Sequence, residues 1–254
     1  MTKIMILADD SSNSGFASEH GFSALVKHGG KRVLLDFGQK TAFENAKKIG
    51  IELGEIDFAV LSHGHFDHSN GLNIFEKGTL YCHPLAFEEK FRKDGSYIGA
   101  PVDVKRAGEK YDLQLLKGQE ELAPGIVFSG EVPRTVEKAR AVGYLDRNAQ
   151  IPDPCIDDAS LFLIDDGNVT VLTGCAHSGI LNIVEKAGEF GKVAAVVGGL
   201  HTKDCSEAEV MDLGNRLGKE CRVFAGHCTG TDKLKTLARE TSVEPIYPGK
   251  TIVV

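Results

Sequence analysis

The chain has 254 residues, 42% of them hydrophobic, with a formal net charge of -7 and a pI near 5.7. This length is enough to bury a full core, so we expect one domain spanning residues 1–254. The acidic balance argues against a nucleic-acid partner, since phosphate backbones require a basic surface, and it favours a small molecule as the partner.

The first ten residues contain only a short apolar run, residues 4–7, closed by Asp9 and Asp10. That run is too short for the core of a signal peptide, and no stretch of the chain is long enough to cross a bilayer. The six cysteines show no regular framework spacing, which indicates reduced thiols. We therefore expect a cytoplasmic protein without a membrane partner, while its oligomeric state stays open.

Short runs rich in Val, Ile and Leu alternate with stretches of helix length, a pattern typical of an α/β fold. The first half predicts strands and one helix in the order strand 4–7, strand 22–26, strand 32–36, helix 41–49 and strand 58–61. The turn sequence His28-Gly29-Gly30-Lys31 predicts that two of these strands form a hairpin.

The second half repeats the pattern, with helices between its strands. The predicted strands are 160–164, 169–173, 193–197 and 222–225. Asp165-Asp166-Gly167-Asn168 predicts another hairpin turn. Residues 94–119 show no clear period, and we expect a loop over the functional site there.

The strongest chemical signal is the run S-H-G-H-F-D-H at residues 62–68, directly after the strand 58–61. Residues i and i+2 of an extended chain point to the same side, so His63 and His65 can bind one cation together. Asp67 and His68 must turn away, a geometry that suits a second cation. Imidazole and carboxylate favour zinc, iron or manganese, with magnesium a further candidate. The alternative is an exposed histidine-rich loop.

Three more histidines, His177, His201 and His227, each follow a predicted strand and precede a helix. If those strands are parallel neighbours, their carboxyl ends share one edge of the sheet and the histidines converge there. We interpret His177 and His227 as metal ligands. For His201 a ligand role and a structural role are evenly balanced.

We expect the amino ends of the helices that follow these histidines to bind anions. Ser178 and either Thr231 or Asp232 have the residue type and position of helix N-caps. Helix amino ends facing the site would favour an anionic substrate.

Cysteines and an aspartate lie beside the candidate ligands. Cys175 is either a thiolate ligand or a small buried residue, and Cys228 is better interpreted as the latter. Asp36, at the end of a buried strand, either orients a ligand imidazole or is an ordinary turn residue. The remaining histidines, His20, His28 and His83, are interpreted as surface residues or as neighbours of the ligands.

The segments L-L-D-F-G and S-H-G-H-F-D-H, followed by histidines at strand ends, resemble the metallo-β-lactamase superfamily. The resemblance implies a four-layer αββα sandwich with metals in a cleft at one edge of two sheets. E-H-G-F-S-A-L-V, T-G-C-A-H-S-G-I-L-N-I, V-G-G-L-H and G-H-C-T-G also resemble the subgroup named for dihydropterin-ribofuranosylaminobenzene-phosphate synthase. Members of that subgroup are mostly called metal-dependent hydrolases without a known substrate.

The chain departs from the superfamily pattern at two places. Between the H-x-H-x-D-H run and the next ligand strand the superfamily usually supplies another histidine, and here only His83 or Glu131 is available. Where the superfamily usually has a bridging aspartate, this chain has Cys175. Two arrangements therefore stay open: a full pair of metals, or one firmly held metal with a second held loosely.

The resemblance leads to a specific mechanism as an expectation. His63 and His65, with His177 or His227, would hold one cation, and Asp67 and His68 with the remaining histidine would hold another. Such cations lower the pKa of a bound water and polarise a phosphoryl or carbonyl oxygen. The candidates for catalysis are Asp67 and His201, and those for substrate binding are Arg134, Lys203 and Thr229.

Two reactions fit this site, both on a small phosphorylated or anionic substrate. One is hydrolysis, and the other is synthase-like transfer, in which an arylamine displaces the diphosphate of a pterin. The alternatives are an iron-centred redox enzyme and a metal-holding binding module without turnover. A nuclease is the least favoured, because of the acidic balance.

Overall fold

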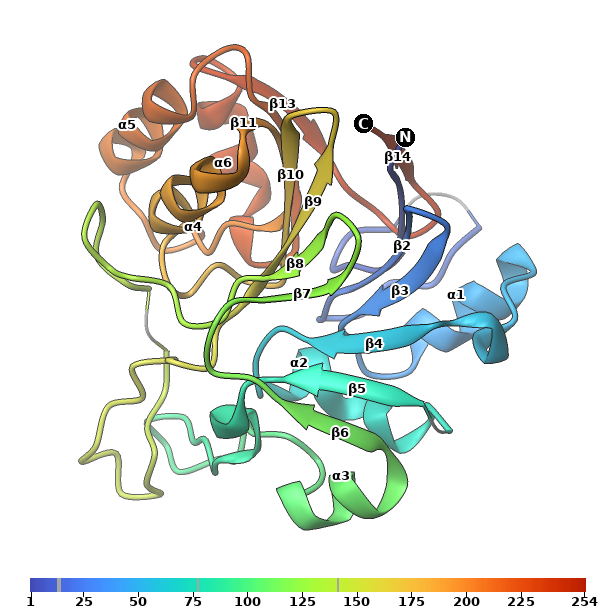
Figure 1. The fold of residues 1–254 in the computed structure, drawn as a ribbon. Helices are drawn as coiled ribbons and strands as arrows, with labels where there is room; N and C mark the ends of the chain where they lie inside the picture. Colours follow the sequence, from blue (N-terminus) through green and yellow to red (C-terminus); the bar gives the residue numbers. More distant parts are fainter. Residues whose placement is uncertain (13–14, 77, 141) are drawn as a thin grey trace.

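The computed structural model describes residues 1–12, 15–76, 78–140 and 142–254, and its described strands form two seven-stranded sheets (Figure 1). The first sheet contains, in spatial order, β14 (Thr251–Val253), β1 (Lys3–Ala8), β2 (Ser23–His28), β3 (Lys31–Leu35), β4 (Phe58–Leu61), β5 (Thr79–Cys82) and β6 (Asp112–Leu115). The second contains β13 (Ser242–Pro245), β12 (Arg222–Gly226), β11 (Lys192–Gly199), β10 (Asn168–Thr173), β9 (Ser160–Asp165), β8 (Ile126–Phe128) and β7 (Glu120–Ala123).

Both predicted hairpins are confirmed. Strands β2 and β3 are antiparallel with His28 opposite Lys31, and β9 and β10 are antiparallel with Asp165 opposite Asn168. The predicted parallel arrangement of β10, β11 and β12 is also confirmed. The carboxyl ends of these three strands therefore lie at one edge of the second sheet.

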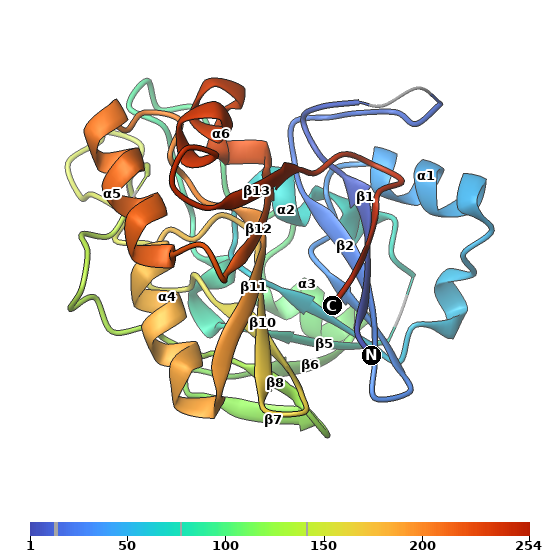
Figure 2. The ribbon, with the colours of Figure 1, turned by 90° about the horizontal axis from the view of Figure 1, so that it is seen from above.

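Helices cover the outer faces of the sheets (Figure 2). They are α1 (Thr41–Ile49), α2 (Phe66–Ser69) and α3 (Val104–Lys110) beside the first sheet, and α4 (Ile180–Ala187), α5 (Glu207–Leu217) and α6 (Thr231–Leu237) beside the second.

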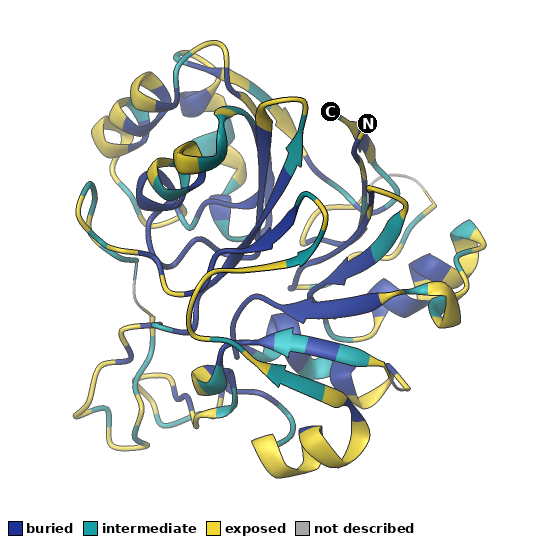
Figure 3. Ribbon diagram, in the orientation of Figure 1, coloured by how far each residue is buried: buried dark blue, intermediate teal, exposed yellow. Residues whose placement is uncertain are grey.

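The buried apolar residues fall into three layers. One cluster lies between the sheets and joins residues such as Val60 of the first sheet to Leu172 of the second. A second cluster lies under α1 and α3, and a third lies under α4, α5 and α6. Figure 3 shows the buried strands between helices whose outer faces are exposed. The predicted four-layer αββα sandwich is confirmed.

Three local predictions are wrong. Residues 94–119 are not one loop, because they contain α3 and β6, and β6 pairs with β5 in parallel. Ser178 does not cap α4, and neither Thr231 nor Asp232 caps α6. The N-cap positions are Gly179 and Gly230, whose φ values of 94° and 85° suit glycine.

No described helix is long and apolar enough to cross a membrane.

Candidate metal centre

Three buried imidazoles face one another at the edge where the two sheets meet. The ring centroids of His63 lie 4.7 Å from those of His65 and of His177, and the latter two are 4.9 Å apart. Ser62 Oγ lies 2.9 Å from Nδ1 of His63, and the carbonyl of Arg140 lies 2.8 Å from Nδ1 of His177. The Nε2 atoms of all three histidines are buried and have no hydrogen-bond partner among the described residues.

Those three unpartnered nitrogens are the test of fit for a metal. Buried polar atoms are nearly always satisfied, and convergent imidazole nitrogens are a typical ligand set for zinc and related divalent ions. Cys175 Sγ lies within 4.8 Å of ligand atoms of His63 and His177, and His65 forms a separate close group with Cys155 and His177. These residues therefore fit a first metal site.

A second group of donors lies directly beside the first. His68 Nε2 is 3.1 Å from both Cys175 Sγ and His227 Nε2. His227 Nε2 is 3.4 Å from a carboxylate oxygen of Asp67. Cys175 belongs to both groups, at the strand end where the superfamily pattern has a bridging aspartate. The donor set thus fits a second ion, with a thiol in the shared position.

Carboxylates orient the imidazoles of this second group. Asp36 Oδ2 lies 2.7 Å from Nδ1 of His68, and Asp36 also accepts hydrogen bonds from the backbone and hydroxyl of Ser62. Asp10 lies 2.6 Å from Nδ1 of His227. In each histidine the Nδ1 contact leaves Nε2 facing the donor group.

The protonation states suit metal binding. Burial, with the neighbouring His68, holds the pKa of His63 well below its usual range, and burial lowers the pKa of His177 to about 4. Burial alone would raise the pKa of Asp67, but nearby histidines, His68 first, hold it well below its usual range. His63 and His177 are therefore neutral and Asp67 is ionised near neutral pH, whereas burial alone would lower the pKa of His227 but contacts with Asp10 and Asp67 raise it well above its usual range.

Unusual backbone conformations mark the strand ends that carry the site. Asp36, Ala176, His201 and His227 have φ values of 56°, 57°, 48° and 48°, in the left-handed region that non-glycine residues rarely adopt. Each lies just after a strand, at β3, β10, β11 or β12. The sharp turn there directs the chain across the sheet edge, and the surrounding packing must hold it.

A buried charged network supports the loop between His63 and His65. The Nζ of Lys90 is 2.7 Å from Asp153 and 3.1 Å from Asp157, and all three side chains are at most 3% exposed. The other oxygen of Asp157 accepts the backbone N–H of Gly64 at 2.8 Å. The network thus fixes the backbone between two ligands.

His201 lies beside the cluster, with its ring centroid 4.5 Å from that of His177. It belongs to none of the close donor groups found among the described residues. Burial lowers its pKa to about 3, so it is neutral. His201 lines the cavity over the metal site, and its catalytic role stays a prediction.

The three predicted substrate-binding residues lie apart from that cavity. Arg134 donates to the carbonyl of Cys155, and the buried Thr229 accepts from the backbone of Leu200. Lys203 lines a neighbouring cavity that reaches His227.

The two candidates for the additional superfamily histidine pair with each other. His83 Nε2 lies 3.1 Å from Glu131 Oε1, and neither belongs to a close donor group among the described residues. Cys228 packs beside Cys175, its Sγ 3.7 Å from the Cys175 carbonyl, and all six cysteines are free thiols.

The sequence left His20 as a surface residue or a neighbour of the ligands, and it marked neither Asp10 nor Arg92 as a residue of the site. His20 bridges Asp10 and Asp67, at 2.9 Å and 3.3 Å, and is half-exposed at the mouth of the site. The position of Asp10 at the end of the first strand was a usable signal, since that strand ends at the same edge. Arg92 also lines the cavity, and no sequence pattern marked it.

The cavity over the cluster has a volume of about 130 Å³. Its lining includes histidines and Asp67 together with Phe66, Arg92 and Ile98. It admits a small reacting group, and Arg92 supplies a positive charge for an anion.

Comparison with known proteins identifies one family model and two similar sequences. Residues 19–185 match a family model described as the metallo-beta-lactamase superfamily. An uncharacterized protein of Methanocaldococcus jannaschii is 32% identical over 98% of this chain and 99% of its own length. The 7,8-dihydropterin-6-methyl-4-(beta-D-ribofuranosyl)-aminobenzene-5'-phosphate synthase of the same organism is 29% identical over 98% of this chain and 96% of its own length.

Among solved structures, Tm1679, described as a metal-dependent hydrolase of the beta-lactamase superfamily, is 27% identical. It superimposes with a TM-score of 0.88 over 100% of this chain and 99% of its own.

Proposed function

The chain belongs to the metallo-β-lactamase superfamily, and from that premise we propose that it is a metal-dependent enzyme that hydrolyses a small phosphorylated substrate. The observation that carries the proposal is the set of buried, unpartnered Nε2 atoms of His63, His65 and His177 beside a second donor group. Zinc is the ion that best fits imidazole with a thiol, with iron and manganese as alternatives.

When bound, the ions supply Lewis acidity and lower the pKa of a water molecule. The protein's own groups position the reaction. Asp67 is ionised and lies at the cavity wall, where it accepts a hydrogen bond from the attacking water. Arg92 lies at the same cavity and neutralises the charge of the phosphoryl group. His201 is neutral and can hydrogen-bond to the leaving group.

A second candidate function is synthase-like transfer. The supporting observation is the 29% identity to a dihydropterin-ribofuranosylaminobenzene-phosphate synthase over nearly the full length of both chains. In that reaction an arylamine takes the place of water as nucleophile, and the same donors would hold the diphosphate. The two functions differ in the nucleophile admitted, so one assay series separates them.

The test replaces His65 with alanine. Turnover should fall by more than the 10- to 100-fold loss that is typical when a residue orienting a ligand is removed, because His65 is itself a proposed ligand. Metal content and hydrolysis of bis(p-nitrophenyl) phosphate are measured with added zinc, manganese or iron, together with pterin condensation.

The matched control is His83→Gln, which alters a buried histidine outside the donor groups. It should retain metal and turnover. Undiminished turnover in His65→Ala would defeat the assignment. Product from a pterin diphosphate and an arylamine, with release of diphosphate and without hydrolysis of the phosphodiester, would favour the transferase.

A further inference from the structure

A thiol that the sequence did not mark lies against the metal site. Cys155 is fully buried, and its Sγ lies within 4.8 Å of ligand atoms of His65 and His177. The Nε2 atoms of both histidines are buried and have no hydrogen-bond partner among the described residues. The thiol itself makes only long contacts, 3.7 Å to the carbonyl of Val142 and 3.9 Å to that of Asp153. A cation held by the two imidazoles would therefore have a sulfur donor within reach.

The backbone of Cys155 is held in an unusual conformation. Its φ of 48° lies in the left-handed region that residues other than glycine rarely adopt. Its N–H donates to Asp153 Oδ1 at 2.7 Å, and its carbonyl accepts from Arg134 at 2.8 Å and from the backbone of Asp158 at 3.3 Å. Arg134, which the sequence suggested for substrate binding, is thus one of the groups that fix the position of this thiol.

The buried ion pairs of Lys90 connect the thiol to the histidine loop. Asp153 accepts the N–H of Cys155, and its other oxygen lies 2.7 Å from the Lys90 ammonium. Asp157 contacts the same ammonium and accepts the N–H of Gly64, between two of the histidines. The thiol and the imidazoles are therefore held at a set spacing, which is the preorganisation that a metal ligand requires.

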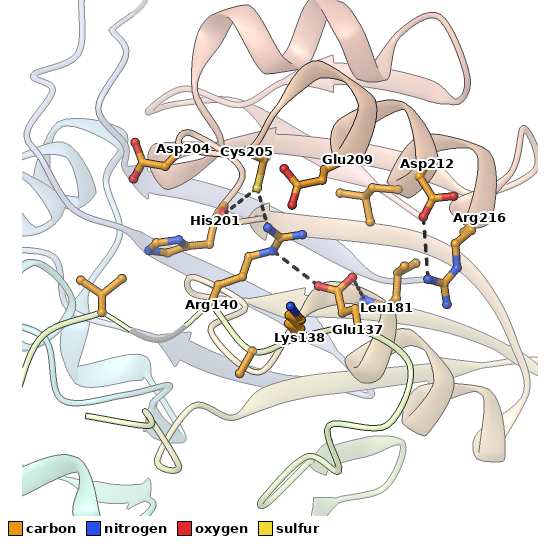
Figure 4. Close-up of a pocket in the computed structure, with 13 residues that line it drawn as sticks. Glu137, Lys138, Arg140, Leu181, His201, Asp204, Cys205, Glu209, Asp212 and Arg216 are labelled. Carbon is orange, nitrogen blue, oxygen red and sulfur yellow. Dashed lines mark hydrogen bonds and ion pairs between the residues drawn. The ribbon is translucent and has the colours of Figure 1, made fainter. Parts of the chain in front are cut away.

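The other cysteines provide a comparison. Cys82 and Cys221 lie in the apolar core, and Cys205 lines a neighbouring cavity of about 470 Å³, where its thiol contacts Arg140 (Figure 4). None of these three cysteines belongs to a close donor group among the described residues. In the described part of the chain, Cys155 and Cys175 are the thiols that share such a group with histidines.

The chemistry of a thiol at this position favours particular ions. Imidazole with thiolate is a typical ligand set for zinc, whereas manganese and magnesium prefer oxygen ligands. Burial first, and then the carboxylates of Asp153 and Asp157, raise the pKa of the Cys155 thiol. The thiol therefore keeps its proton until a bound cation displaces that proton into solvent.

We propose that Cys155 is a thiolate ligand of the ion held by His65 and His177, and that it makes this site selective for zinc over manganese. The inference rests on the proposed function in one respect, since it requires an ion at the first donor group. It adds a residue to that group and determines which ion the group prefers.

The test is a titration with Co²⁺, which takes the place of zinc and gains an intense near-ultraviolet charge-transfer band from a sulfur ligand. Cys175→Ala removes the other thiol of the donor groups, so the band that remains in this variant reports on Cys155. The band should be present in Cys175→Ala and absent from the double variant Cys155→Ala, Cys175→Ala.

A second measurement is the affinity for zinc and for manganese, by competition with a chelator. Cys155→Ala should weaken zinc by at least about tenfold, the lower end of the loss on removing a residue that only supports a ligand. Manganese should be affected less, so the zinc preference falls. Cys82→Ala is the matched control, at a buried thiol outside the donor groups, and it should retain the wild-type preference.

Two outcomes would overturn the inference. One is cobalt bound to Cys175→Ala without a charge-transfer band, and the other is equal zinc affinity in Cys155→Ala and the wild-type protein. If Cys175→Ala binds no cobalt, or if a variant does not fold, a crystal of the zinc-loaded wild-type protein decides. A ligand requires a distance of about 2.3 Å between zinc and Sγ of Cys155, and a sulfur outside bonding distance refutes it.

Phosphodiester hydrolysis is measured on the same samples, so that the two proposals can fail separately. A band that depends on Cys155 in a protein without turnover would reject the hydrolase but retain the thiolate ligand. Turnover that depends on His65, without a sulfur band in Cys175→Ala, would reject the ligand alone. A wild-type protein that binds neither zinc nor cobalt would overturn both.

Discussion

At the scale of single residues, the site depends on groups that never touch the substrate. The Asp36 carboxylate accepts three hydrogen bonds, from the backbone and hydroxyl of Ser62 and from Nδ1 of His68. Because that carboxylate lies at Nδ1, the Nε2 atom of His68 is left to face the second donor group. We therefore expect the affinity for a metal to depend on Asp36 as well as on the residues that bind the metal.

Replacing Asp36 with asparagine should weaken the second metal about 10- to 100-fold, because the amide cannot act as a charged acceptor for His68. The measurement is competition with a chelator, scored as metal ions bound per chain. Stoichiometry should fall from two towards one at a chelator concentration that the wild-type protein tolerates. Asp57→Asn, at a carboxylate paired with Lys31, is the control. Equal affinities in Asp36→Asn and wild type would refute an orienting role.

At the scale of elements, the segment that carries His63 and His65 is stabilised by a buried ion-pair network around Lys90. Its ammonium lies between Asp153 and Asp157, and Asp157 binds the N–H of Gly64. Burial alone would lower the pKa of Lys90, but the two aspartates, Asp157 first, raise it well above its usual range. The lysine is therefore charged, and its loss would leave uncompensated carboxylates in the interior.

Lys90→Met should destabilise the protein by about 3–5 kcal/mol, the usual cost of removing one partner of a buried ion pair. The free energy of unfolding in urea measures this. The triple variant Lys90→Met, Asp153→Asn, Asp157→Asn should recover part of the loss, since no buried charge is left unpaired. A Lys90→Met protein as stable as wild type would show that the network carries no such energy.

The sequence predicted the elements that have strong local periodicity. The helix over residues 41–49 and the strand over 58–61 have the predicted bounds, and β10, β11 and β12 lie in parallel as expected. Strands β5 to β8 were missed because they are only three or four residues long, and β6 and β7 are largely exposed, so alternation within them is weak.

The candidate site was predictable where its residues lie close together in the sequence. His63, His65, Asp67 and His68 share one run, and the topology gathers His177 and His227 beside them. Lys90 was not predictable, because its partners lie more than 60 positions away and no motif joins them. The N-cap positions of α4 and α6 were missed because serine and threonine, the usual capping residues, lie next to the glycines in the sequence. The positive φ angles of those glycines are not visible in the sequence.

At the scale of the whole molecule, several histidines are buried where the two sheets meet, and burial favours their neutral form. Burial lowers the pKa of His177 to about 4 and that of His201 to about 3, and it also lowers those of His63 and His65. Their unfolded values lie near 6.5, so the unfolded chain binds more protons between these limits. Stability is therefore full above pH 6.5 and is lost as the pH falls towards 4.

For each of His177 and His201, the metal-free protein should lose stability with a slope that approaches about 1.4 kcal/mol per pH unit as the pH falls from 6.5 towards 5. His227 acts in the opposite direction, because contacts with Asp10 and Asp67 outweigh burial and raise its pKa, but the lowered groups outnumber it. Urea unfolding with a chelator at several pH values checks the slope. His177→Gln should flatten it, and a flat wild-type profile would contradict the burial argument.

The donors come from both sheets, since residues 63–68 follow β4 and Cys175, His177 and His227 follow β10 and β12. During synthesis the amino-terminal half emerges first and can begin to fold alone. It then holds only part of a coordination sphere. The second donor group is complete only after His227 has left the ribosome, so we expect a chain truncated before His227 to lack the second metal.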